Sequence, residues 1–132
     1  MLRLVRRPLV ALGAAALALS GCGGGPPDTD QVRSAVIAFS RATAGKDYRR
    51  LCDDLLAPKL VEDVKAAGLS CEAALERGLG AVKDPKLTIG RIAVDGDTAR
   101  VQVRTSARGQ APSQDTLKLT KVGGRWRIAS LG

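Results

Sequence analysis

Residues 86–105 read KLTIGRIAVDGDTARVQVRT, and this stretch decides the fold. Its apolar residues alternate with polar ones, which is the pattern of a β-strand with one buried face. Leu87 and Ile89 share one face at odd positions, whereas the next apolar pair, Ile92 and Val94, stands at even positions. This slip predicts a β-bulge, and a bulge bends its strand. The stretch therefore predicts a curved strand at the start of a sheet.

The same alternation continues to the end of the chain. Asp95-Gly96 is a strong signal for a tight hairpin, and Gly123-Gly124 predicts a second turn. We expect further strands over residues 98–105, 114–122 and 125–131, with a loop at 108–113. The residues expected to face inward are Ala99, Val101, Val103, Thr105, Leu117, Leu119, Trp126 and Ile128. The pattern predicts an antiparallel sheet of four strands.

Residues 28–79 show helical spacing of apolar residues instead. The first helix is expected over 28–44, with Asp28 as its N-cap, Gln31 completing a capping box, and Gly45 ending it. Three shorter helical segments are expected to follow: one capped by Asp47, one with Pro58 in its first turn, and one capped by Ser70. Helices first and a curved antiparallel sheet second predict an α+β domain, with the N-terminal helices packed on the sheet.

The first 21 residues have the layout of a secretory signal. Arg3, Arg6 and Arg7 form a basic start, and an apolar run follows from Leu9 to Leu19. As a helix this run is roughly 16 Å long. It is too short to remain as a span, because the hydrocarbon core of a bilayer is about 30 Å thick. We therefore expect export, with the segment removed afterwards.

Leu19-Ser20-Gly21-Cys22 resembles the lipobox of bacterial prolipoproteins. The resemblance implies that Cys22 receives a diacylglycerol and becomes the mature N-terminus, and two acyl chains suffice for stable anchoring. We expect a signal peptide at 1–21, a lipidated cysteine and Gly/Pro tether at 22–27, and a domain at 28–132 on the outer leaflet of the cell membrane. The alternative is an ordinary signal peptide in which Cys22 is incidental.

The amino-acid composition excludes several kinds of catalytic and binding site. The chain has no histidine, which removes His-based acid–base catalysis, His metal ligands and Ser-His or Cys-His nucleophile pairs. We expect no cofactor and no metal. The formal net charge is +8, but there is only one Phe, one Tyr and one Trp. Nucleic-acid binding usually combines basic residues with stacking aromatics, so we do not expect nucleic acid as a partner.

Two cysteines remain once Cys22 is assigned to lipid. Cys52 and Cys71 form an even pair outside the cytoplasm, which predicts a disulfide. Closing a loop of about 20 residues stabilises a domain by about 3 kcal/mol in the chain-entropy model. The alternative is a pair of buried free thiols.

The order of the elements and the terminal Gly-Gly-Arg-Trp-Arg-Ile at 123–128 resemble small lipoproteins of high-GC bacteria with the NTF2-like (cystatin-like cone) fold. The resemblance implies a sheet curled around the helices and a cone that can hold a ligand pocket. Phe39, Tyr48 and Trp126 are candidates for its lining, although core packing is the favoured role for Tyr48 and Trp126. The superfamily includes isomerases and dehydratases, and its sheet-face dimers make a homodimer possible.

Arg100, Arg104 and Lys118 are expected on one exposed face of the sheet. Such a face either keeps the sheet soluble and protects it from edge pairing, or docks an anionic partner. No catalytic constellation emerges from the sequence. We therefore expect a membrane-anchored, non-catalytic module that binds a small apolar ligand or a protein partner. The alternatives are a cone-pocket isomerase or lyase, and a structural accessory subunit of a cell-envelope complex.

Overall fold

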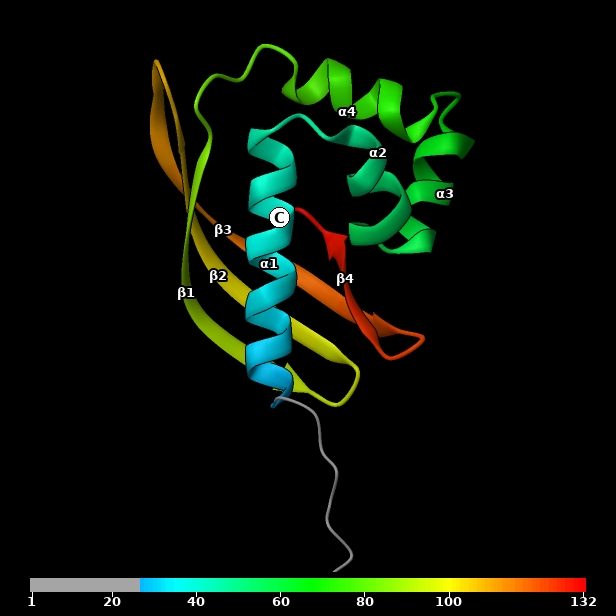
Figure 1. Ribbon diagram of the computed structural model, residues 1–132, viewed down its shortest axis with the longest axis vertical. Coiled ribbons are helices and arrows are strands. Elements are labelled where there is room, and N and C mark those ends of the chain that lie inside the picture. Colours follow the sequence, from blue (N-terminus) through cyan, green and yellow to red (C-terminus); the bar gives the residue numbers. More distant parts are fainter. Residues whose placement is uncertain (1–26) are drawn as a thin grey trace, which may run out of the picture.

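The alternating stretch at residue 86 begins a curved sheet in the computed structural model, which describes residues 27–132 (Figure 1). The predicted signal peptide and the lipid attachment site at Cys22 lie outside the described residues. So does the predicted tether, except for Pro27. Each helix of the described part is too short or too polar to span a bilayer.

The sheet has four antiparallel strands in the order β1-β2-β3-β4. They are β1 (Lys86–Asp95), β2 (Thr98–Ala107), β3 (Gln110–Val122) and β4 (Arg125–Ser130). The β1–β2 register shifts between Ile89 and Ile92, which confirms the predicted bulge. Both predicted turns, at residues 95–98 and 122–125, join neighbouring strands. The predicted α+β class with a curved four-stranded sheet is confirmed.

The prediction of a loop at residues 108–113 is wrong, because β3 already begins at Gln110. The β2–β3 register shifts between Thr105 and Ala107, opposite the segment that holds Pro112. That part of β3 pairs with β2 on one side, whereas the β3–β4 register starts only at Lys118. Proline is tolerated at such an edge, since its missing N–H costs no ladder bond there. Residues 110–113 include polar residues and a proline, yet they extend the β2–β3 hairpin.

Helix α1 spans Asp28–Ala44 and ends before Gly45, as predicted. Asp28, however, is not the N-cap. The cap position belongs to Pro27, and no side chain caps this end. The Asp28 carboxylate instead accepts hydrogen bonds from β3 and β4, so a tertiary contact replaces the expected local one.

The shorter helices are α2 (Tyr48–Arg50), a π-helical turn η1 (Leu51–Leu55), α3 (Pro58–Ala66) and α4 (Cys71–Leu79). Asp47 and Ser70 cap α2 and α4 as predicted, each accepting a backbone N–H bond of 3.2 Å. The Cys52–Cys71 disulfide is present, with an S–S distance of 2.06 Å. It ties η1 to the first residue of α4.

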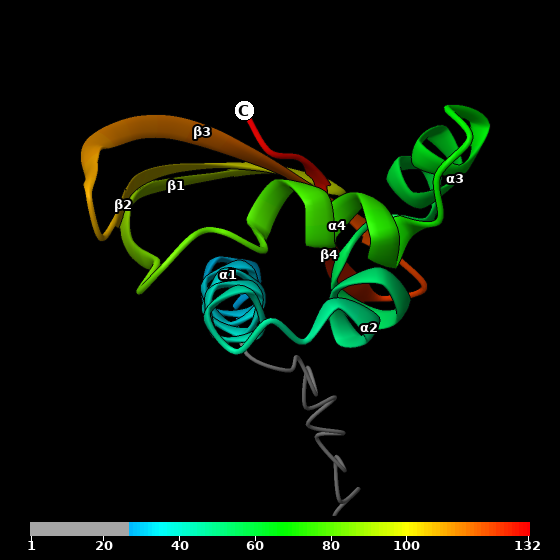
Figure 2. The same cartoon turned by 90° about the horizontal axis from the view of Figure 1, so that it is seen from above.

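The sheet arches over α1, and the shorter helices gather at one side of it (Figure 2). The core lies between α1 and the concave face of the sheet. Within residues 27–132, its buried apolar residues come from α1, the region of the shorter helices and strands β2 to β4. They are Val32, Val36, Phe39, Ala42, Leu51, Leu56, Ala57, Cys71, Ala99, Val101, Val103, Leu117, Leu119, Trp126 and Ile128.

Candidate functional site

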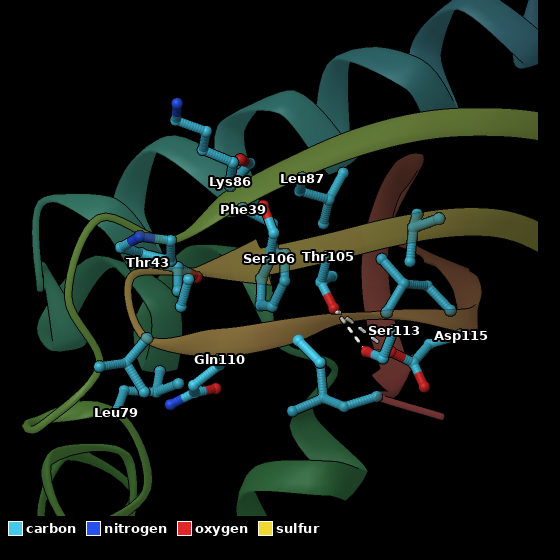
Figure 3. Close-up of a pocket in the computed structure, with 18 residues that line it drawn as sticks. Phe39, Thr43, Leu79, Lys86, Leu87, Thr105, Ser106, Gln110, Ser113 and Asp115 are labelled. Atoms are coloured by element: carbon cyan, nitrogen blue, oxygen red, sulfur yellow. Dashed lines mark hydrogen bonds between the residues drawn. The ribbon is translucent and has the colours of Figure 1, made fainter.

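A cavity of about 250 Å³ lies between the concave face of the sheet and the C-terminal half of α1 (Figure 3). The chain between α4 and β1 closes one side of it. Most of its wall is apolar. The lining residues are Phe39, Ser40, Thr43, Leu79, Val82, Pro85, Lys86, Leu87, Val103, Thr105, Ser106, Ala107, Gln110, Ala111, Ser113, Asp115, Leu117 and Leu131.

The position of the cavity follows from the unequal lengths of the strands. Strands β2 and β3 continue to the hairpin at residues 107–110, whereas β4 pairs only with residues 118–122 of β3. The extra length of the β2–β3 hairpin leaves part of the concave face without a fourth strand. Val103 and Leu117 mark the border, because both are buried in the core and also line the cavity. The cavity is therefore an extension of the core towards one end of the domain.

Three oxygen-bearing side chains form a polar patch on the sheet wall of the cavity. Ser113 Oγ donates to Asp115 Oδ2 at 2.9 Å, and it lies 2.9 Å from Thr105 Oγ1. Thr105 Oγ1 is also 3.4 Å from the same carboxylate oxygen. These interactions appear as dashed lines in Figure 3. The sequence predicts that Thr105 faces inward, and its position in the cavity wall confirms this.

The helix wall contributes one further polar atom. Thr43 Oγ1 is buried and has no hydrogen-bond partner among the described residues. A buried hydroxyl without a partner costs about 1–3 kcal/mol. Thr43 is one of the lining residues, and its hydroxyl oxygen is covered there by neighbouring protein atoms.

The structure does not bring the three predicted lining residues together. Phe39 lines the cavity, but Trp126 lines a separate surface hollow beside α1 and η1. Tyr48 lies outside both linings and packs against the core, and its buried hydroxyl has no hydrogen-bond partner within residues 27–132. Trp126 and Tyr48 do not reach the cavity because it lies at the β2–β3 hairpin. Trp126 is on β4, and Tyr48 is the first residue of α2.

Trp126 belongs instead to a cluster that fixes the start of α1. Asp28 Oδ1 accepts from Lys121 Nζ at 3.0 Å and from Trp126 Nε1 at 3.4 Å. The Lys121 ammonium also lies 5.7 Å from the centre of the Trp126 ring, within range of a cation–π contact. The hydrogen bond from Lys121 lowers the pKa of Asp28, partial desolvation opposes it, and the Trp126 bond adds to the lowering. The cluster joins the first residue of α1 to β3 and β4.

Arg100, Arg104 and Lys118 are exposed on the convex face of the sheet. Arg100 and Lys118 stand directly opposite each other in the β2–β3 register. None of the three makes an ion pair with a described residue. Like charges placed opposite each other on a sheet are mildly destabilising. Their role as a docking face for an anionic partner stays a prediction.

Asp115 and Ser113 are site residues that the sequence reasoning missed. Asp115 has the same parity as Leu117 and Leu119, so strand alternation places it on the concave face. Ser113 lies in the segment 108–113, for which the sequence predicts a loop. Over residues 27–132, no group of three or more Cys, Asp or Glu side chains is arranged to hold a metal ion.

The fold is similar to NTF2-like proteins of known structure. A protein of unknown function from Silicibacter pomeroyi aligns with a TM-score of 0.53 and 19% identity, over 76% of this chain and 88% of the other. One from Shewanella baltica, also of unknown function, gives 0.53 and 13%, over 77% and 88%. A de novo designed NTF2 fold protein gives 0.51 and 17%, over 77% and 84%. At these identities the likeness shows the fold alone.

No protein-family model matches the chain, and no curated protein matches its sequence. The structural comparisons therefore place the described residues in the NTF2-like fold and go no further. The chemistry of the cavity has to be inferred from its own residues.

Proposed function

We propose that this protein is a membrane-anchored, extracytoplasmic lipoprotein whose NTF2-like domain binds a small, mostly apolar molecule without transforming it. The observation that carries the proposal is the cavity on the concave face of the sheet. Its walls are formed mainly by apolar side chains, and a few polar groups stand at defined points. This combination is typical of small-molecule binding sites.

The size and the rim of the cavity support a small ligand. Drug-sized molecules usually occupy sites of roughly 300–1,000 Å³, and this cavity holds about 250 Å³. Leu131 lines it while remaining 49% exposed, which is high for a large apolar side chain. A ligand seated in the cavity would cover part of Leu131 and gain hydrophobic free energy from doing so.

The proposed anchor would be attached at the end of the domain opposite to the cavity. Its lining comes from the end of α1 and from the β2–β3 hairpin, at the opposite end of the domain from Asp28 (Figure 1). Thr43 lies 15 residues beyond Asp28, which is about 22 Å along a helix axis. A lipid attached at Cys22, shortly before Asp28 in the sequence, would be joined to the end of the domain that lies away from the cavity. We therefore expect ligand to enter from the aqueous side.

One observation favours a second candidate, an isomerase- or lyase-like enzyme. Asp115 places a carboxylate in a largely apolar cavity, where it could act as a general base on a bound molecule. The two readings differ in the fate of the ligand. A binding module returns its ligand chemically unchanged after prolonged incubation, whereas an enzyme yields a product, and Asp115→Asn abolishes its formation.

Replacing Cys22 with serine tests the anchor. We expect Cys22→Ser to remove the lipid and to shift the protein out of the washed membrane fraction, because serine offers no thiol for the thioether link. Intact-mass measurement of the native protein should show a diacylglycerol adduct on a chain beginning at Cys22. Full retention of the variant on washed membranes, or a native mass without fatty acid, would contradict the lipoprotein assignment.

Blocking the cavity tests the binding site. A ligand that binds only the folded state stabilises it by about 2.7 kcal/mol at 100 times its Kd. We expect the neutral probe 2-phenylethanol to raise the Tm of residues 27–132. Ala107→Phe, which adds a ring to the cavity wall, should abolish that increase.

The matched control is Ala93→Phe. Ala93 is exposed on β1 opposite Arg100, on the convex face of the sheet, so the same added ring lies away from the cavity. This variant should keep the increase in Tm. An equal response of the two variants would overturn the assignment of the site.

A further inference from the structure

We propose that the cavity selects a small amine, with its ammonium group on Asp115 and its hydrocarbon part on the apolar walls. This inference rests on the proposed binding function and specifies the class of ligand. It follows from the charges in the lining, from the hydrogen bonds around Asp115, and from the lack of an ion pair between this carboxylate and any described residue.

The lining contains one acidic and one basic side chain, Asp115 and Lys86. Asp115 makes no ion pair with any residue between 27 and 132. Lys86 is exposed at the start of β1, and in Figure 3 its side chain extends away from Asp115. The carboxylate therefore dominates the electrostatics of the polar patch, and a cationic ligand group would be attracted to it.

The hydrogen bonds around Asp115 leave a surface of acceptors. Ser113 and Thr105 have one hydroxyl proton each, and the hydrogen bonds of these hydroxyls run to each other and to Asp115 Oδ2. Both hydroxyl protons are then committed inside the patch. Asp115 Oδ1 accepts no hydrogen bond from the described residues. The free lone pairs of this patch can accept hydrogen bonds, so they favour a ligand group that carries several hydrogen-bond donors.

An ammonium group meets this requirement better than an alcohol or a carboxylate. It carries three N–H donors and a positive charge, whereas an alcohol brings one donor and a carboxylate brings acceptors only. Hydrogen bonds that involve charged groups are also stronger than neutral ones. The carbon skeleton of the ligand would pack on Phe39 and Leu87, both of which line the cavity.

Three probes with closely similar skeletons test the inference on residues 27–132: phenethylamine, 2-phenylethanol and 3-phenylpropanoate. We expect phenethylamine to bind at least about tenfold more tightly than 2-phenylethanol at low ionic strength, as measured by NMR titration. The carboxylate should bind least well. This comparison within the native domain needs no variant.

Asp115→Asn should reduce the preference for the amine to less than about twofold while leaving the affinity for 2-phenylethanol nearly unchanged. Asp63→Asn changes the net charge equally on exposed α3, away from the cavity, and should keep the preference. Equal binding of amine and alcohol to the native domain would overturn the selectivity and leave the proposed function standing. An amine preference that survives in Asp115→Asn would also overturn it. Failure of all three probes to bind would overturn the binding function as well.

Discussion

Trp126→Ala is expected to lower the free energy of unfolding by about 3–5 kcal/mol, the range for removing a buried aromatic side chain. Trp126 is only 6% exposed and packs in the core. Its Nε1–H also donates to Asp28, so the variant loses a tie between β4 and the start of α1. Urea denaturation of residues 27–132 followed by circular dichroism measures the effect, since Trp126 is the only tryptophan.

Trp126→Phe is the matched control. It keeps an aromatic ring in the core but removes the indole N–H, so it separates packing from hydrogen bonding. We expect a clearly smaller loss than for alanine. If Trp126→Ala destabilised the domain by less than about 1 kcal/mol, Trp126 could not have the buried position that the structure gives it.

Removing the disulfide is the second change with a large expected effect. The double variant Cys52→Ala, Cys71→Ala should lose about 2–5 kcal/mol, as is usual for a native disulfide in a small secreted domain. The two cysteines are 19 positions apart, so the link constrains a loop of moderate length in the unfolded chain. Cys71 is also buried, so part of the loss would come from packing.

Reduction of the native domain with dithiothreitol separates these two contributions. The reduced protein keeps both sulfur atoms, so its loss of stability reports the crosslink alone. We expect the reduced protein to be intermediate between the oxidised protein and the double variant. An oxidised and a reduced domain of equal stability would show that the link between η1 and α4 contributes nothing to the fold.

The parts of the fold that follow from local rules were predictable from the sequence. The odd-to-even slip between Ile89 and Ile92 predicted the bulge, because strand alternation is strict wherever one face is buried. Caps at Asp47 and Ser70 were predictable for the same kind of reason, since their side chains bond to N–H groups three residues away.

Features that depend on distant partners were not predictable in this way. Aspartate is a residue type that commonly caps a helix N-terminus. The Asp28 carboxylate instead accepts hydrogen bonds from Lys121 and Trp126, which lie more than 90 positions further along the chain. Residues 51–55 have helical spacing, yet five residues are too few to distinguish an α-helix from the π-helical turn that forms. The sequence predicted a loop at residues 108–113, because it cannot show that this part of β3 pairs with β2 on one side only.

The candidate site was only partly predictable. The resemblance to NTF2-like proteins implied a cone with a pocket, and Phe39 does line the cavity. The sequence did not indicate at which end of the sheet the cavity lies, because this depends on where β4 stops relative to β3. For that reason the sequence indicated Trp126 and Tyr48 as possible lining residues, but not Thr105, Ser113 or Asp115.

The proposal that the concave-face cavity binds a small apolar molecule is tested most directly by methyl NMR of residues 27–132 titrated with 2-phenylethanol. The account predicts saturable shifts confined to methyl groups of the lining, notably those of Val82, Leu87 and Leu117. Methyl groups of Val61 and Val64 on α3, which lie outside that lining, should stay unchanged. Shifts that grow linearly without saturation, or that are largest on α3, would contradict it.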